Sequence, residues 1–198
     1  MPTNGYTTVA AVKGEVGITD SADDTRLDRI VTAVSRLIDD YVGHPLYAGS
    51  GARYFRARSP VEVLTDPFTA FSEVAYDQAG DWATYVAITG AVASPFNATA
   101  VDRPYTGLML GSGASASFPA GDRGVRVTAT WGHGASTPAI AAEACILQCT
   151  LVFRTQMAAG SPLAGGGEYQ GPLVQAGLHP LVRRMLDPLR TGASAGVA

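Results

Sequence analysis

The chain has 198 residues, of which 46% are apolar and 16% are charged. This composition excludes an intrinsically disordered protein, and the length is sufficient for a buried core. Its net charge is −3, and Lys13 is its only lysine. Because a protein that holds duplex DNA through the phosphates normally carries a basic patch, this charge pattern argues against stable DNA binding.

The charge imbalance is concentrated in residues 1–45, which contain four basic and seven acidic side chains, whereas the remainder of the chain is neutral. No run of about 18 apolar residues is present, and the start of the chain lacks the pattern of a signal peptide. We therefore expect a soluble protein of the cytoplasm that has no membrane partner.

A short helix followed by a long helix is predicted at the N-terminal end. The short helix covers residues 9–15 and follows a threonine cap, and the long helix covers residues 20–43 with Asp20 or Ser21 as its N-cap. Apolar residues spaced by three and four form one continuous stripe along the long helix: Leu27, Ile30, Val31, Val34, Leu37, Ile38 and Tyr41. Such a stripe requires another element to cover it.

Residues 46–135 are rich in Gly, Pro, Ser and Asp and contain short runs with β-type alternation. They predict strands at residues 52–58, 61–64, 72–76, 84–88, 116–118 and 125–131. Residues 90–113 are expected to form an irregular loop. The glycines on both sides of His133 indicate a tight turn between the last strand and the next helix.

A third helix is predicted from Thr137 and Pro138, a capping residue and a proline at the first helical position, to about residue 158. Because it is apolar on nearly all sides, it predicts a core position combined with a subunit contact. A linker composed of small and polar residues follows, and the sequence HPLVRRMLDPLR then predicts one or two helical turns.

These elements predict an α+β fold. Residues 1–159 would form a small helical core with a β-rich insertion at about 46–135. Residues 160–198 would form a flexible linker and an extended C-terminal arm.

No constellation of catalytic or metal-binding residues is predicted. Ser194 lies in a G-x-S-x-G match, but the nucleophile elbow requires a strand before the serine and a helix after it, and neither is indicated there. Cys145 and Cys149 would supply only two ligands on one helix face, whereas zinc takes three or four. We interpret both cysteines as small buried hydrophobes and expect no cofactor and no enzyme activity.

In their order, these parts resemble the head-to-tail connector (adaptor) proteins of long-tailed double-stranded DNA bacteriophages. The resemblance rests on the opening TTVAAVKGEVGITDSADDTRLDRIVTAVSRLIDDYVGHPL and on RPYTGLML followed by FPAGDRGVRVTATWGHGASTPAIAAEACILQCTLVFRTQ. It also rests on the linker SPLAGG and on the closing HPLVRRMLDPLR. Residues 59–100 match least.

The resemblance implies a virion protein that forms a ring, commonly of twelve copies, under the portal protein at the capsid vertex. DNA would pass through the ring, and the next neck or tail protein would bind its far side. The resemblance implies contacts with the portal or a neighbour by Leu178, Leu181, Arg183, Arg184, Met185, Leu189 and Arg190. It implies a subunit-interface or channel position for Asp39, Asp40, Ile146, Phe153 and Met157.

Three alternatives remain open. The protein could be another neck component, such as a stopper or tail-completion protein, although its long N-terminal helix argues against those mostly β folds. It could be a small serine hydrolase that uses Ser194 or another serine, or a general α+β binding module. The pair Arg183 and Arg184 fits either a contact patch for an acidic partner or ordinary solvated arginines.

Overall fold

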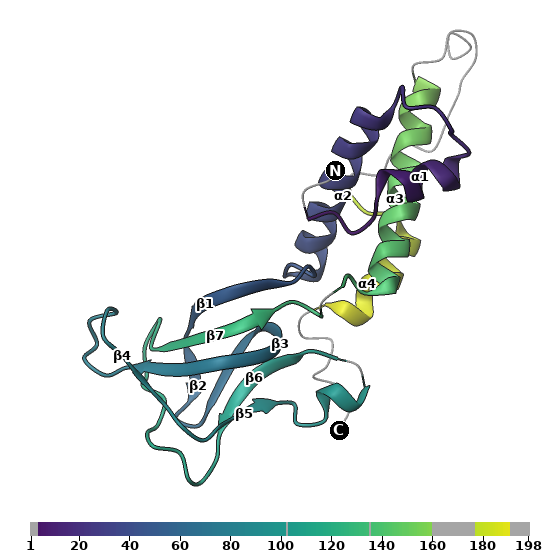
Figure 1. Ribbon diagram of the computed structural model, residues 1–198. Coiled ribbons are helices and arrows are strands. Elements are labelled where there is room, and N and C mark those ends of the chain that lie inside the picture. Colours follow the sequence, from purple (N-terminus) through teal and green to yellow (C-terminus); the bar gives the residue numbers. More distant parts are fainter. Residues whose placement is uncertain (1–3, 102, 135, 160–176, 191–198) are drawn as a thin grey trace. The chain divides into compact units, whose positions relative to one another are not determined.

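A computed structural model describes residues 4–101, 103–134, 136–159 and 177–190 (Figure 1). The chain divides into two compact units: a helical unit within residues 1–45 and 137–198, and a sheet unit of residues 46–136. Helices and an antiparallel sheet together confirm the predicted α+β fold.

The helical unit contains α1 (Val9–Val16), α2 (Asp24–Val42), α3 (Ala139–Ala159) and α4 (Pro180–Leu186), with the 3₁₀ helix η3 (Asp187–Leu189) after α4. The two long helices α2 and α3 are far apart in the sequence but pack side by side, and α1 contacts both of them. Because α4 packs against α3 as well, the closing segment belongs to the same unit.

Local caps define the start of α1 and the C-terminal ends of α1 and α2. The Thr8 hydroxyl accepts a 3.1 Å hydrogen bond from the Ala11 amide at the start of α1. Gly17 and Gly43 follow the two helices with φ of 84° and 89°, a backbone conformation that glycine adopts without strain. The Gly43 amide donates to the Asp39 carbonyl at 2.8 Å and so closes the last turn of α2.

The start of α2 differs from the prediction. The predicted N-cap at Asp20 or Ser21 is wrong, because the helix begins at Asp24 and Asp23 occupies the cap position without a side-chain hydrogen bond. Asp20 instead accepts a 2.9 Å hydrogen bond from the Ala22 amide, which forms a turn before the helix.

The core of the helical unit is formed by the predicted apolar stripe of α2 and by residues of the other helices. Its buried apolar side chains are Tyr6, Val12, Leu27, Ile30, Val31, Val34, Ile38, Val42, Ala141, Ala144, Cys145, Cys149, Phe153, Leu178, Val182 and Leu186. Three of these, Leu178, Val182 and Leu186, come from the closing segment. The described part of the predicted extended arm is therefore packed into the helical unit, since its own apolar residues complete the core there.

The sheet unit contains seven strands and the 3₁₀ helix η1 (Ala98–Val101). The strands are β1 (Gly49–Phe55), β2 (Ala57–Ser59), β3 (Glu62–Asp77), β4 (Tyr85–Ala87), β5 (Ala91–Ser94), β6 (Tyr105–Leu110) and β7 (Val125–Trp131). Their order is β1-β7-β3-β6-β5, and β2 and β4 pair with the long strand β3. All of the pairs are antiparallel.

The strand prediction is partly wrong. The two predicted strands at 61–64 and 72–76 belong to one strand, β3, whose register shifts near Pro67 where its partner changes from β6 to β7. The expected loop at 90–113 contains β5, η1 and β6. The predicted strand at 116–118 is absent from the described sheet, although the Phe118 amide donates to the Pro60 carbonyl at 2.8 Å and its ring is buried.

The core of the sheet unit is formed by the inward side chains of β3, β6 and β7. They surround Phe68 and Trp131, whose rings pack edge to face.

Gly132 follows Trp131 with φ of 100°, and a Cβ atom there would lie 2.6 Å from the Tyr47 carbonyl oxygen. Only glycine fits this close approach, which confirms the predicted turn beside His133.

Candidate interaction surfaces

The closing segment presents a basic and partly apolar face. Leu181 is 52% exposed, and Arg183, Arg184 and Arg190 are exposed as well, whereas Met185 and Leu189 are half-buried. Leu178 is buried in the core of the helical unit, so it contributes no contact surface in this structure.

Two tight contacts fix this face to α2. The Tyr41 hydroxyl donates a 2.6 Å hydrogen bond to Asp187, and the Arg190 guanidinium lies 5.0 Å from the centre of the Tyr41 ring.

Within residues 4–159 and 177–190, as far as they are described, Arg183 and Arg184 form no ion pair. Their two charges are therefore available to an acidic partner.

The two neighbouring acids of α2 differ in role. Asp39 accepts a hydrogen bond from the hydroxyl of buried Tyr6, and it forms a 3.2 Å ion pair with Arg36. Asp40 is exposed. Asp39 thus anchors the N-terminal segment, and Asp40 is the residue of this pair that presents its charge to solvent.

The three candidate residues of α3 also lie in different environments. Phe153 is 2% exposed and packs in the core, with the Arg26 guanidinium 5.5 Å from its ring centre. Ile146 is half-buried. Met157 is 47% exposed, and its sulfur accepts a hydrogen bond from Arg26 at 3.3 Å. Of the three residues, Met157 offers the most surface to a neighbour.

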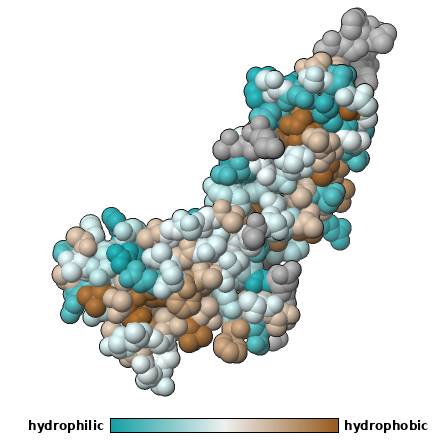
Figure 2. Space-filling view, viewed as in Figure 1, coloured by the Kyte–Doolittle hydropathy of each residue, from teal (hydrophilic) through white to brown (hydrophobic). Residues whose placement is uncertain are grey.

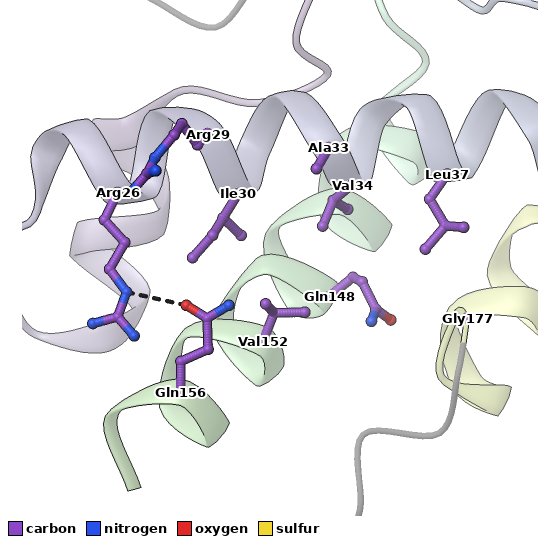
Figure 3. A pocket seen from close by; sticks show the side chains of 10 residues that line it. All are labelled: Arg26, Arg29, Ile30, Ala33, Val34, Leu37, Gln148, Val152, Gln156 and Gly177. Carbon is purple, nitrogen blue, oxygen red and sulfur yellow. Dashed lines mark hydrogen bonds between the residues drawn. The ribbon is translucent and has the colours of Figure 1, made fainter. Parts of the chain in front are cut away.

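A groove of about 550 Å³ runs between α2 and α3; we call it the α2–α3 groove (Figure 3). Its lining comprises Arg26, Arg29, Ile30, Ala33, Val34, Leu37, Gln148, Val152, Gln156 and Gly177. Figure 3 shows Arg26 and Arg29 at one end, Gly177 at the other, and apolar side chains between them. The groove thus combines an apolar centre with a cationic end, a pattern that fits an apolar side chain accompanied by a carboxylate.

The cationic end of the groove is partly preorganised. The Arg26 Nε donates a 3.0 Å hydrogen bond to the Gln156 side chain, which links α2 to α3. In contrast, the exposed side chain of Arg29 makes no hydrogen bond or ion pair with any other residue of the described part of the chain. Periodicity predicted this stripe of α2, but it gave no signal that part of the stripe lines an open groove.

The sheet unit carries a rigid loop that presents an aromatic side chain; we call residues 77–84 the Trp82 loop. The buried carboxylate of Asp77 accepts hydrogen bonds from the amides of Gly80 at 2.8 Å and Trp82 at 2.9 Å. Asp81 accepts from the amide of Thr84 at 2.8 Å and also from its hydroxyl. These bonds hold the loop in one conformation, although Trp82 itself is 58% exposed.

Further apolar side chains are exposed on the sheet unit, where Figure 2 shows hydrophobic surface. Val92 lies opposite Met109 in the β5–β6 pair, and both side chains are exposed on the same face of the sheet. Phe96 is 79% exposed. These exposed side chains are candidate contacts for other proteins.

An aromatic and basic cluster covers another part of the sheet. The rings of Tyr54 and Tyr85 have centres 5.5 Å apart, with Arg123 over the first ring and Arg126 over the second. Burial raises the pKa of the Tyr85 hydroxyl, which donates to the Arg123 carbonyl at 2.9 Å. Because Arg126 also pairs with Glu73 at 3.1 Å, the cluster is held largely by its own contacts.

The two cysteines form a buried pair on α3. The sulfur atoms of Cys145 and Cys149 are 3.9 Å apart, and both side chains are buried. The hydrogen bond with Cys145 and burial raise the pKa of the Cys149 thiol, so this thiol is protonated at neutral pH. The described residues contain no cluster of three or more metal-ligating side chains, and Ser194 lies outside them.

In the part of the chain that the structure describes, no helix is both long and apolar enough to cross a bilayer.

No protein-family model matches the chain, and no curated protein matches it. Two solved structures of gene transfer agent (GTA) particles contain similar chains. One is described as "Neck of empty GTA particle computed with C6 symmetry"; the TM-score is 0.57 at 19% identity, over 92% of this chain and 88% of that chain. The other is described as "Virion of native gene transfer agent (GTA) particle"; the TM-score is 0.59 at 21% identity, over 96% and 92% of the two chains. At these identities the likeness concerns the fold, and it spans nearly the whole length of each chain.

Proposed function

We propose that this protein is a structural component of the neck of a phage-like particle. It forms a ring adaptor that binds the portal protein at the capsid and accepts the next neck or tail protein on its far side. The observation that carries this proposal is the fold likeness to chains of GTA particles, one of them in a neck, over about nine-tenths of both chains. The protein would be located in the virion after assembly in the host cytoplasm.

A ring of twelve copies is compatible with the sixfold symmetry stated for the GTA neck. Each copy carries exposed apolar and charged groups on both units, as a subunit with several partners requires. The absence of a basic block in the sequence fits a ring through which duplex DNA passes without being held. In this role the protein needs neither a cofactor nor catalysis.

The portal contact is assigned to the exposed side of α4. Leu181, Arg183 and Arg184 project from a short helix that the core fixes through Val182 and Leu186. A rigid helix with one apolar side chain and two cationic side chains that form no ion pair with the described residues suits an acidic groove on a partner.

The test is native mass spectrometry of the protein with and without purified portal, combined with negative-stain images. The wild-type protein is expected to form rings, alone or on the portal. The double variant R183E/R184E is expected to lose portal docking, while R103E/R154E, which makes the same change in net charge at other exposed arginines, docks normally. Undiminished docking by R183E/R184E would disprove the assignment to α4, and a monomer that ignores the portal would disprove the adaptor function.

Another neck component, such as a stopper or tail-completion protein, is the second candidate. It is supported only by the same fold likeness. The descriptions of the two similar structures name the neck and the virion, and they do not specify a particular neck protein. Binding to purified portal separates the two roles, because an adaptor binds the portal directly.

A further inference from the structure

We propose that Trp82 of one copy inserts into the α2–α3 groove of a neighbouring copy, and that this contact repeats around the ring. The inference rests on the proposed function, because it specifies how the copies of a ring adaptor join. It assigns roles to the Trp82 loop and to the groove that neither the sequence nor the fold likeness provides.

The Trp82 loop has the properties of a preformed anchor. Trp82 has φ of 58°, a left-handed conformation that is uncommon for a non-glycine residue, and the buried carboxylate of Asp77 holds its amide there. Because the loop is already ordered, docking would cost little additional conformational entropy. Exposed tryptophans on ordered elements are enriched among the residues that dominate binding free energy.

The groove provides a matching receptor. Its floor contains the buried side chains of Ile30 and Val34, and Leu37 and Val152 extend its apolar surface. A volume of about 550 Å³ gives room for a large aromatic side chain. A tryptophan that is fully covered buries roughly 150–250 Å² of surface, which would remove the exposed apolar parts of both partners from water.

Charge complementarity supports Trp82 as the occupant. Asp81 precedes Trp82 in the chain, and its carboxylate remains charged because the Thr84 and Ala83 amides lower its pKa. At the rim of the groove, Arg29 has no acidic partner among the described residues. Phe96 is more exposed than Trp82, but it lies between Pro95 and Asn97 and brings no adjacent charge.

The two surfaces belong to different parts of the chain, so the contact is heterologous: each copy uses its loop toward one neighbour and its groove toward the other. A heterologous contact produces a closed ring when its rotation closes, and it leaves no copy with an unused surface. This is the type of contact that the proposed ring requires.

Site-specific cross-linking tests the contact directly. Chains carrying A83C, which keep Trp82 and place a cysteine at the exposed residue beside it, are mixed with chains carrying A33C, and a short bis-maleimide is added. Ala33 is an exposed residue that lines the groove. The mixture is expected to give a covalent dimer linked between positions 83 and 33, whereas each variant alone gives none. Because Cys145 and Cys149 are buried, they serve as an unreactive background. Mixing F96C with A33C is the matched control and is expected to give no dimer.

Two further variants measure the contribution to assembly. W82A is expected to weaken ring formation by at least about 30-fold, as truncation of a binding hot spot does. A33W fills the groove from an exposed helical position and should block assembly without disturbing the loop. R29E should also weaken assembly, whereas R154E, at an exposed arginine outside the groove lining, should not.

The outcomes separate this inference from the proposed function. Rings that form normally from W82A and A33W, without the 83–33 cross-link, would overturn the Trp82 contact and leave the ring adaptor intact. A wild-type protein that forms no ring, with or without the portal, would overturn both.

Discussion

The phenolic oxygen of Tyr41 in α2 lies 2.6 Å from the carboxylate of Asp187, a residue 146 positions later in the chain. On the same side, a ring nitrogen of His44 lies 3.2 Å from the Leu189 carbonyl oxygen. These bonds join the end of the long N-terminal helix to the closing segment. They explain why the surface that we assign to the portal is presented by a fixed helix.

The first prediction concerns this hydrogen bond. Y41F removes the donor and should loosen η3 and the end of α4, with a loss of about 0.5 kcal/mol because the pair is largely exposed. Hydrogen exchange of the amides in residues 181–190 should increase in the variant, while exchange in β7 stays unchanged. Equal exchange in the wild type and the variant would show that the core residues Val182 and Leu186 hold the segment without this bond.

The same pair predicts a dependence on alkaline pH. The hydrogen bond to Asp187 raises the pKa of the Tyr41 hydroxyl above its ordinary value of 10.0. The stabilisation is therefore fully present below pH 10.0 and is lost as the pH rises through the raised pKa. Titration followed by hydrogen exchange should show this loss in the wild type and not in Y41F.

The second prediction separates the two neighbouring acids of α2. D39N removes the charge that binds Arg36 and weakens the acceptor for the buried Tyr6 hydroxyl, so it should lower the free energy of unfolding by about 1.5 kcal/mol. D40N changes an exposed side chain and should have almost no effect on stability. Urea unfolding of both variants measures the difference. If D40N were as destabilising as D39N, our assignment of Asp39 as the anchor would be wrong.

The third prediction concerns α3. F153A should destabilise the protein by about 3–5 kcal/mol, because Phe153 is buried and its removal leaves a cavity. M157A should cost far less, since Met157 is largely exposed, but it is the better candidate to weaken contacts between copies. Thermal unfolding measures the first effect and sedimentation measures the second. A stable, folded F153A variant that assembles poorly would show that Phe153 acts at a subunit interface and not in the core.

The long helices were predictable because their signals are local. The spacing of Leu27, Ile30 and Val34 reports one buried helix face wherever the partner comes from. The continuity of β3 was not predictable in this way, since Pro67 interrupts the pattern and removes a hydrogen-bond donor. The register shifts that accommodate it depend on the neighbouring strands β6 and β7.

The candidate surfaces were less predictable from the sequence than the helices and strands, because they depend on tertiary structure. No sequence pattern distinguishes Ile30, which lines the α2–α3 groove, from Leu27, which does not, because the difference arises from how α3 packs. The predicted strands at 72–76 and 84–88 left Trp82 between them, but a tryptophan is ordinarily expected to be well buried. Only the hydrogen bonds of Asp77 and Asp81 show that this one is held at the surface.

The last prediction concerns acid and the Trp82 loop. The amides of Thr84 and Ala83 lower the pKa of Asp81 below its ordinary value of 3.8, because they donate hydrogen bonds to the charged carboxylate. A carboxyl group with a lowered pKa stabilises the folded loop above pH 3.8, and this stabilisation is lost as the pH falls through the lowered pKa. Exchange of the Ala83 and Thr84 amides should therefore gain protection relative to the intrinsic rate as the pH rises from about 2.5 to about 5. In D81N this change should be absent, because asparagine keeps an acceptor but does not titrate in this range. The amides of β7 report on acid unfolding of the whole sheet unit, so an equal change there would show that Asp81 has no separate effect on the loop.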